Sequence, residues 1–358
     1  MPQVSDRPDR RESLGLRAGD WVEVRNEDEI LSTLDAEGCL DALPFMPEML
    51  RYCGKRFQVF KSAHKACDTI RSWSRIRLMK DAVHLQGLRC DGEAHGGCQA
   101  GCLLYWKEAW LKRAPGPASK LDQRSASSTS IDPPGRAAPR CDVNALHRAT
   151  RAATPAEAGA EERFRCQATD LPRATVRARR WDLRHYVRDL LSGNVRRRDF
   201  IRYGLYAAFN NLRPFPHIRG LAGEKTPLGE VLDLRPGEWV QVRSQEEILR
   251  TLNPKLRHRG LFFDVEMLPF CGRTYRIHRR VERLIDDKTG LMRLPRSACF
   301  ILENVACSGC LSRGRMFCPR SIYPFWHEIW LQRVDVAQAG SGIQLPKTSE
   351  THAITAHD

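Results

Sequence analysis

One stretch of the chain occurs twice, and this duplication constrains the fold more than any other feature. Residues 17–34 are RAGDWVEVRNEDEILSTL, and residues 235–252 are RPGEWVQVRSQEEILRTL. Trp21 matches Trp239, and the same register continues without a gap to Phe57 and Tyr275. Self-similarity over such a length indicates two copies of one structural unit. We therefore expect two related domains, which a chain of 358 residues can accommodate.

Each copy begins with the patterns of a strand and a helix. Residues 21–25 and 239–243 alternate apolar and polar side chains, as a half-buried strand does. A capping-box spacing then predicts a short helix in each copy, at Asn26 with Glu29 and at Ser244 with Glu247. Further strands are expected at residues 57–60, 275–278, 298–302 and 329–334. Many short strands and few helices favour a mainly β fold with some α, in which each copy forms a small β-barrel.

The motifs of the two copies resemble a known fold. Gly-(Asp/Glu)-Trp-Val-x-Val-Arg opens each copy, and Met-Leu-x-(Tyr/Phe)-Cys-Gly-(Lys/Arg) follows at residues 49–55 and 267–273. Together these motifs look like an SH3-like barrel repeat, and the chain is similar to bacterial tandem-repeat proteins that carry this unit. The resemblance covers a little over half of the chain. It implies two tandem SH3-like repeats with a binding role, and it assigns no reaction.

Composition divides the rest of the chain. Residues 114–165 are rich in Pro, Ser, Ala and Gly and cannot bury enough apolar surface to fold, so they predict a disordered linker. The arginine-rich residues that follow predict a basic helical hairpin, broken at Gly193 and Asn194. The expected organisation is a disordered lead (1–16), a first repeat (17–113), the linker (114–165), the basic helical segment (166–215), a connector (216–234), a second repeat (235–334) and a disordered tail (335–358).

A cysteine-rich loop lies near the end of the first copy. It reads CDGEAHGGCQAGC, and it supplies Cys90, His95, Cys98 and Cys102. Thiolate and imidazole suit Zn²⁺, and four such side chains close together in sequence can complete a tetrahedral site. Folding could add further ligands from elsewhere in the copy, namely Cys53, His64 and Cys67. The alternative is a set of buried free cysteines that act as small apolar residues.

A second cysteine-rich loop lies at the matching place in the second copy. It reads CSGCLSRGRMFC, and it supplies Cys307, Cys310 and Cys318, with Cys271 as the expected fourth ligand. Alignment of the copies pairs Cys90 with Cys307 and Cys98 with Cys318, whereas His95, Cys102 and Cys310 have no Cys or His counterpart. The two loops therefore differ in their ligands. We expect structural zinc, which stabilises small domains with a limited core.

Other uses of these cysteines stay open. A redox-active CxxC pair needs a βαβ setting, which the residues around Cys307 and Cys310 do not provide. An iron–sulfur cluster needs four thiolates, which either loop could supply with a remote cysteine. A zinc enzyme needs an open coordination position, and the loop that holds His95 is the better candidate. The common phosphate-binding, dinucleotide-binding and hydrolase motifs do not occur, so no catalytic residue is assigned.

Aromatic residues close both copies. The segments are YWKEAWL at residues 105–111 and FWHEIWL at residues 325–331. A ligand-stacking surface is one interpretation, but large aromatic side chains more often fill a core. We therefore expect four tryptophans in the cores of the two copies, namely Trp106, Trp110, Trp326 and Trp330.

The chain is basic, with a formal net charge of +15. Arginines crowd residues 173–202, where apolar residues interleave at helical spacing. Such a segment attracts polyanions, so nucleic acid or an anionic membrane surface is a candidate partner. The alternative is a solvated face that has no partner. The candidate polyanion-binding residues are Arg177, Arg179, Arg180, Arg184, Arg188, Arg196, Arg197, Arg198 and Arg202.

The leading functional hypothesis is a non-enzymatic binding or adaptor protein. Its two zinc-braced repeats would engage a protein or polymeric partner together, since duplication raises avidity. The alternatives are nucleic-acid or anionic-surface binding through residues 173–202, and a zinc enzyme or iron–sulfur protein that uses one cysteine loop. The sequence contains no apolar run long enough for a membrane span and no secretory pattern in its first residues, so we expect a cytoplasmic protein.

Overall fold

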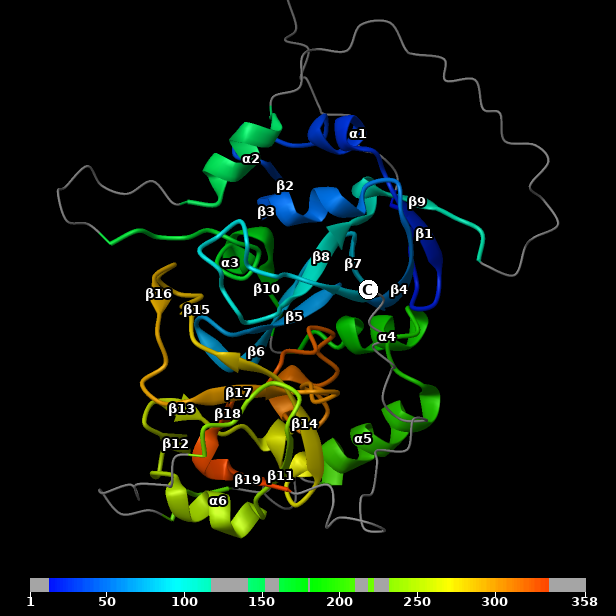
Figure 1. Cartoon of the computed structure of the whole chain (residues 1–358). Coiled ribbons are helices and arrows are strands. Elements are labelled where there is room, and N and C mark those ends of the chain that lie inside the picture. The colour runs from blue at the N-terminus through cyan, green and yellow to red at the C-terminus, as the bar shows by residue number, and fades with distance from the viewer. Residues whose placement is uncertain are drawn as a thin grey trace, which may run out of the picture.

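The computed structural model describes residues 13–116, 141–151, 161–179, 181–209, 218–221 and 232–334. These residues form a mainly β structure with short helices, which confirms the predicted fold class at that level. In Figure 1 the first repeat (blue to cyan) lies against the second repeat (yellow to red), and helices α4 and α5 (green) run along one side. Among the described helices, none is long and apolar enough to cross a membrane.

The first repeat is built on a five-stranded antiparallel sheet. Val22 and Val24 are buried while Trp21 and Glu23 are half-buried, which is the pattern of a strand with one face on a core. The strand order is β8-β7-β4-β1-β9, and Trp21 pairs with Gln58. The strands are β1 (Trp21–Val24), β4 (Arg56–Ser62), β7 (Ala82–Arg89), β8 (Leu103–Lys107) and β9 (Leu111–Arg113).

The second repeat has a sheet that corresponds to the first strand for strand. Its order is β18-β17-β14-β11-β19, and Trp239 pairs with Arg276, the residue that matches Gln58 in the duplication. The pairing of the next strand shifts register after Val59 in the first sheet and after its counterpart Ile277 in the second. The strands are β11 (Trp239–Val242), β14 (Thr274–Val281), β17 (Cys299–Leu302), β18 (Trp326–His327) and β19 (Leu331–Arg333).

A β-hairpin from each repeat reaches the other repeat. In the first repeat β5 (Lys65–Asp68) pairs with β6 (Ser72–Leu78), and β6 packs against the 3₁₀ helix η4 (Arg313–Arg315) of the second. In the second repeat β15 (Leu284–Ile285) pairs with β16 (Met292–Arg293), beside the cysteine loop of the first. Each hairpin therefore covers the other repeat's cysteine loop. The shorter hairpins are β2 (Cys39–Leu40) with β3 (Leu43–Pro44) and β12 (Arg257–His258) with β13 (Leu261–Phe262).

Both predicted capping boxes are present. Asn26 Oδ1 accepts the backbone N–H of Glu29 at 2.8 Å, and the Glu29 carboxylate accepts that of Asn26 at 3.1 Å. Ser244 and Glu247 form the same reciprocal bonds. The helices are α1 (Glu27–Leu31), α2 (Val143–Ala149), α3 (Leu171–Ala174), α4 (Arg184–Leu191), α5 (Arg197–Phe209), α6 (Gln245–Thr251) and the 3₁₀ helices η1 (Pro47–Tyr52), η2 (Glu108–Trp110), η3 (Val265–Phe270) and η5 (Glu328–Trp330).

Each repeat has an apolar core that contains two tryptophans. The prediction of core positions is confirmed, because Trp106, Trp110, Trp326 and Trp330 are fully buried. Trp110 Nε1 donates to Thr33 Oγ1 at 3.1 Å, and Trp330 Nε1 donates to Thr251 Oγ1 at 2.9 Å. Thr251 is the counterpart of Thr33 in the duplication, so both cores satisfy a buried indole N–H in the same way.

Parts of the predicted disordered segments are ordered instead. In the lead, Leu16 is buried, and its backbone N–H donates to the Glu108 carboxylate at 3.1 Å. In the linker, Asp142 caps helix α2, and Leu146 buries its side chain in the first core. Composition misses such segments because a few apolar residues suffice when they all face a neighbouring core. Residues 1–12 of the lead, 117–140 and 152–160 of the linker, 216–217 and 222–231 of the connector, and the tail at 335–358 lie outside the described residues.

The basic segment contains both helices of the predicted hairpin, α4 and α5, but its beginning differs from the prediction. Helix α4 ends at Leu191, and Gly193 follows with a φ of +73°, as the predicted break requires. Val176 and Arg177 form strand β10 (Val176–Arg177) along β6 rather than a helix. The buried hydroxyl of Thr175 accepts a 2.6 Å hydrogen bond from Arg77 Nε, which fixes this stretch to β6. A long-range contact therefore overrides the helical spacing.

A buried ion pair joins helix α4 to both repeats. Lys65 Nζ on β5 contacts the carboxylate of Asp189 on α4, and both side chains are fully buried. The same ammonium donates to the carbonyl oxygen of Met316 at 2.8 Å, and His64 Nε2 lies 3.2 Å from Asp189 Oδ1. One lysine side chain thus connects the first repeat, the basic segment and the second repeat.

Candidate metal centre

Three side chains with metal-binding atoms meet at the first cysteine loop. Cys90 Sγ lies 3.3 Å from Glu48 Oε1 and 3.4 Å from His95 Nε2, and His95 Nδ1 lies 3.8 Å from Glu48 Oε1. One donor atom from each residue falls within 4.8 Å of the other two. Glu48 and His95 are buried, and Cys90 is half-buried. A thiol, an imidazole and a carboxylate so arranged form a candidate metal centre.

Glycines and a 3₁₀ helix set the shape of this loop. The backbone N–H of Cys90 donates to the carbonyl oxygen of Cys102 at 2.8 Å, which closes the loop at its base. Gly92 has a φ of +78°, and a Cβ atom there would lie 2.0 Å from the carbonyl oxygen of Cys98. Only glycine fits that position. Glu48 lies in the first turn of η1, from which its carboxylate reaches the loop.

Burial controls the protonation of the three groups. Desolvation lowers the pKa of His95 to about 4, so the imidazole is neutral at pH 7. Desolvation also raises the pKa of the Cys90 thiol and of the Glu48 carboxyl group. Glu48 Oε2 and His95 Nδ1 are buried and make no hydrogen bond with any residue that the structure describes. A bound cation would favour the thiolate form of Cys90 and the carboxylate form of Glu48. It would also interact favourably with these buried polar atoms.

A thiol-lined cavity of about 30 Å³ lies beside this group. The residues of its wall with thiol, imidazole, carboxylate or guanidinium groups are Cys90, His95, Cys98, Cys102, Cys166, Asp287 and Arg320. The thiol of Cys166 interacts electrostatically with those of Cys98 and Cys102. The structure therefore brings all four predicted ligands of the first loop to one cavity. It also adds Cys166, and Asp287 and Arg320 from the second repeat.

The second cysteine loop meets a residue of the first repeat. Cys318 Sγ accepts a 3.2 Å hydrogen bond from the backbone N–H of Cys67 on β5, and a second hydrogen bond from the Cys67 thiol. Burial raises the pKa of the Cys318 thiol, but hydrogen bonds from Cys67 and from the backbone of Arg320 outweigh it and lower the pKa to about 7. Cys67 was predicted as an additional ligand of the first loop, and the structure places it at the second.

Three predicted ligands lie apart from these groups. Cys53 follows the last turn of η1, the end opposite Glu48, and the Cys271 thiol donates to the carbonyl oxygen of Met267 at 3.9 Å. Burial raises the pKa of both thiols to about 11. His64 contacts Asp189 and the carbonyl oxygen of His185. We therefore replace Cys53 and Cys271 by other residues in the candidate ligand sets.

Sequence reasoning missed Glu48, although the chain carries a signal for it. Glu48 and Glu266 occupy the same position in the two copies, inside the otherwise apolar stretches PFMPEML and FFDVEML. Both carboxylates are buried beside a cysteine loop. Glu266 accepts hydrogen bonds from Ser308 Oγ at 2.7 Å and from the backbone N–H of Leu311 at 2.8 Å. An acidic residue placed twice among apolar neighbours indicates a buried carboxylate with a specific partner.

The predicted polyanion-binding arginines lie on the surface. Those that the structure describes are exposed, namely Arg177, Arg179, Arg184, Arg188, Arg196, Arg197, Arg198 and Arg202, whereas Arg180 lies outside the described residues. Trp181 is 88% exposed among them. Other large apolar side chains of the segment are more than half exposed, namely Val176, Leu183, Val187, Leu191, Ile201 and Leu205. Basic and apolar side chains therefore share the surface of this segment, which we call the basic apolar segment.

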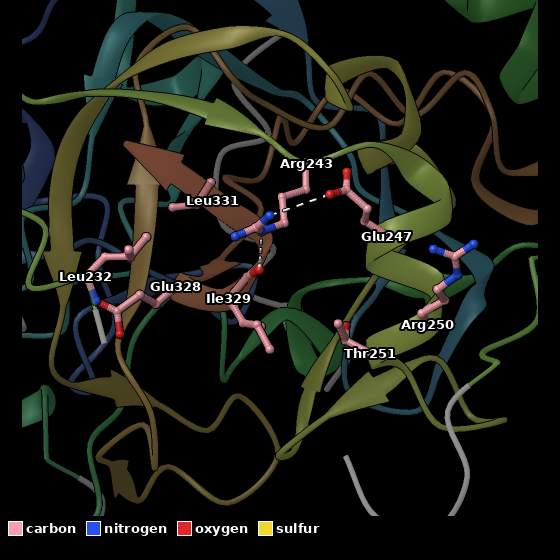
Figure 2. A pocket seen from close by; sticks show the side chains of 8 residues that line it. All are labelled: Leu232, Arg243, Glu247, Arg250, Thr251, Glu328, Ile329 and Leu331. Carbon is pink, nitrogen blue, oxygen red and sulfur yellow. Dashed lines mark hydrogen bonds and ion pairs between the residues drawn. The ribbon is translucent and has the colours of Figure 1, made fainter. Parts of the chain in front are cut away.

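A more open cavity of about 260 Å³ lies beside α6 in the second repeat. Figure 2 shows Arg243 between Glu247 and the carbonyl oxygen of Ile329, with hydrogen bonds of 3.5 and 3.1 Å. Glu328 Oε1 accepts the backbone N–H of Leu232 at 2.9 Å. Because these polar groups already bond to the protein, we assign no ligand to this cavity.

Comparison with protein-family models, with curated proteins and with solved structures gave no match. The function must therefore be inferred from the geometry of the chain itself. That geometry offers a sulfur, nitrogen and oxygen donor group beside a thiol-lined cavity, and a second group of thiols between the repeats.

Proposed function

We propose that this is a metal-binding protein in which Cys90, His95 and Glu48 hold a structural zinc ion. The mutual approach of three buried or half-buried donor atoms carries this proposal. Zinc lies about 2.0–2.3 Å from its ligands, so ligand atoms around a tetrahedral ion are about 3.3–3.8 Å apart. The separations of 3.3 and 3.4 Å from Cys90 Sγ agree with that geometry, and the third pair closes within 4.8 Å.

The fourth ligand would come from the thiol-lined cavity. Cys102 is best placed to supply it, because its backbone carbonyl oxygen already pairs with the backbone of Cys90. A site closed by four protein ligands is structural rather than catalytic. The ion would hold η1, the loop at residues 90–102 and the base of β8 together, in a repeat with a small core.

Metal analysis of the purified full chain tests this proposal. We expect Cys90→Ser and His95→Ala each to remove one zinc ion per chain, while the matched control Cys53→Ser keeps the full amount. A chelator should lower the melting temperature of the wild type by more than it lowers that of Cys90→Ser. Equal zinc contents in the wild type and Cys90→Ser would refute the site.

The proposal also covers the fold of the two repeats and the kind of partner that they bind. Two sheets with the same strand order and register support two SH3-like units that bind an extended protein or polymer together. Zinc in the first unit would stabilise the scaffold and take no part in a reaction. An experimental structure in which neither sheet curves into a barrel would contradict the SH3-like assignment.

A second candidate function is binding to an anionic lipid surface. The observation that favours it is the exposure of Trp181, Leu183 and Val187 between exposed arginines of the basic apolar segment. A basic amphipathic helix with tryptophan inserts its apolar side chains at the headgroup level and pairs its cations with anionic lipids. Nucleic acid would use the arginines and leave the aliphatic side chains in water.

Vesicle sedimentation distinguishes the two polyanions. We expect the full chain to bind phosphatidylserine-containing vesicles and to bind pure phosphatidylcholine vesicles weakly. Trp181→Ala and the pair Arg184→Glu with Arg188→Glu should each weaken binding, whereas Arg257→Glu with Arg259→Glu changes the same charge elsewhere and serves as control. Binding to duplex DNA that depends on Arg184 and Arg188 but not on Trp181, without vesicle binding, would assign the segment to nucleic acid instead.

A further inference from the structure

The second cysteine loop is folded tightly around its own cysteines. Gly309 has a φ of +67°, and a Cβ atom there would lie 2.8 Å from the backbone nitrogen of Cys318. The backbone N–H of Phe317 donates to the carbonyl oxygen of Gly309 at 2.8 Å. Ser308 and Leu311 on either side of Cys310 are held by the buried carboxylate of Glu266. The loop therefore fixes Cys307, Cys310 and Cys318 near one another through its backbone.

The first repeat adds a fourth thiol to this loop. The Cys67 backbone and thiol both donate to Cys318 Sγ, and the Cys67 thiol interacts electrostatically with that of Cys307. The ammonium group of Lys61 interacts electrostatically with the thiols of Cys307, Cys310 and Cys318. Cys67 of the first repeat thus meets the loop that carries Cys307, Cys310 and Cys318 of the second.

We infer that Cys67, Cys307, Cys310 and Cys318 form a second metal site, which binds a single zinc ion through four thiolates. Neither repeat could build this site alone, because three ligands come from one repeat and one from the other. Closed sites of four cysteines are a standard structural arrangement for zinc. The ion would fasten the hairpin β5–β6 onto the second repeat. This site is separate from the one that contains Cys90.

The surroundings suit the charge of such a site. Four thiolates and one Zn²⁺ carry a net charge of −2, which needs compensation in a buried place. The guanidinium of Arg320 supplies one positive charge, with Arg320 Nη1 3.9 Å from Cys67 Sγ. Burial lowers the pKa of Lys61, and thiolates at Cys307, Cys310 and Cys318 would favour its charged form. Arg320 is itself buried, and its Nη1 donates to the carbonyl oxygen of Cys67 at 3.0 Å.

The direct contact of two thiols favours one ion over an iron–sulfur cluster. Each thiolate of a four-iron cluster binds a different iron atom, which keeps the sulfur atoms apart. Around a single zinc ion with Zn–S bonds of about 2.3 Å, neighbouring sulfur atoms lie close to van der Waals contact. The hydrogen bond between the thiols of Cys67 and Cys318 already brings two sulfur atoms together in this way.

The matching place in the first loop explains why the two sites differ. Cys98 Sγ accepts the backbone N–H of Ile285 at 3.4 Å, as Cys318 Sγ accepts that of Cys67 at 3.2 Å. Ile285 is the residue that corresponds to Cys67 when the register of the duplication is continued. An isoleucine therefore occupies the position from which the other repeat would supply a thiol. The first site uses His95 and Glu48 of its own repeat instead.

The test uses the full chain with Cys90→Ser as background, so that zinc at the first site does not contribute. We expect one zinc ion per chain in this background, and no zinc after the further change Cys67→Ser. Cys67→His should retain the ion, because imidazole is also a zinc ligand. The control Cys271→Ser, in the other predicted ligand, should retain it as well. Cobalt substitution should give the intense ligand-field absorption of four-thiolate cobalt, and Cys67→His should weaken that absorption.

A measurement on the wild type avoids variants that fail to fold. The half-buried thiol of Cys310 should resist alkylation by iodoacetamide until a chelator is added, as followed by mass spectrometry of its peptide. Zinc retained in the Cys67→Ser background, or alkylation of Cys310 that a chelator does not accelerate, would overturn the site. A Cys67–Cys318 disulfide in the protein purified under reducing conditions would also overturn it. Iron with acid-labile sulfide in place of zinc would overturn the single ion.

Discussion

The hydroxyl group of Thr69 donates a 2.8 Å hydrogen bond to Oδ2 of Asp287, its own counterpart in the second copy. Two equivalent positions can touch only where the two repeats face each other across a two-fold relationship. The bonds from Cys67 to Cys318 and from Ile285 to Cys98 lie on either side of this contact. The interface between the repeats is therefore nearly isologous, as in a symmetric dimer.

Removal of the Thr69 hydroxyl should weaken the interface. Its oxygen donates to Asp287 and accepts a 3.1 Å bond from Arg320 Nη1, so Thr69→Val leaves two charged groups each short of a partner. We expect a loss of about 1–3 kcal/mol in the free energy of unfolding, measured by chemical denaturation. Thr289→Val removes a hydroxyl that bonds within its own turn and should cost less. Equal losses of unfolding free energy in Thr69→Val and Thr289→Val would show that the hydrogen bond between the repeats contributes no more than one within a turn.

The ion pair of Lys65 and Asp189 should behave as a buried pair. Both side chains are fully buried, so Lys65→Met or Asp189→Leu alone leaves an uncompensated charge and should cost about 3–5 kcal/mol. The double variant should cost less than the sum of the two, because no charge is left behind. Glu162→Gln breaks the pair with Arg151 at 2.6 Å, in which both side chains are about half exposed, and should cost under about 1 kcal/mol. Thermal and chemical unfolding curves of the four variants check this order.

Gly92→Ala should damage the first metal site through the backbone. Gly92 and Gly54 both have positive φ, +78° and +72°, but a Cβ at Gly92 would meet the Cys98 backbone while one at Gly54 has nothing within 4 Å. Gly54→Ala should therefore cost about 1–2 kcal/mol from the left-handed conformation alone. Gly92→Ala should cost more and also reduce bound zinc. A normal zinc content in Gly92→Ala would contradict the close packing of this loop.

Acid should destabilise the protein through its buried neutral histidines. Desolvation lowers the pKa of His84 to about 3, and that of His327 to about 4, whereas an unfolded histidine titrates near 6.5. The unfolded state therefore binds more protons below pH 6.5, so stability is fully present above that pH and is lost as the pH falls toward 3 to 4. His84→Gln should flatten this dependence. Unfolding measured from pH 7 to 4 with a chelator present separates this effect from loss of metal.

The sequence predicted the local features of each repeat well. The duplication identified β1 and β11, the capping boxes at Asn26 and Ser244, and the buried tryptophans, because each depends on spacing within a few residues. The segment around Val176 lies in the arginine-rich stretch that was predicted to be helical, and the structure pairs it with β6. Spacing cannot reveal a strand whose partner lies far earlier in the chain.

The ligand sets could be predicted only in part. The four predicted ligands of the first loop lie close together in the sequence, and the structure brings them to one cavity. Alignment of the two copies then suggested Cys53 and Cys271, since it compares each residue with its counterpart. Such a comparison does not tell which repeat a side chain contacts. Cys67 and Cys166 enter the sites through tertiary contacts that no local pattern records.

The hairpins β5–β6 and β15–β16 each cover the cysteine loop of the other repeat. This arrangement affects how the surroundings of the two loops could come to differ. In a homodimer of single repeats, one sequence would have to serve both copies of the interface, so a change at one site would appear at the other. Within one covalent chain, the equivalent positions of the two repeats are separate residues and can mutate independently. Cysteine can stand at 67 while isoleucine stands at 285, and threonine at 69 can meet aspartate at 287. Joining the repeats in one polypeptide thus allows the surroundings of each cysteine loop to change without changing those of the other.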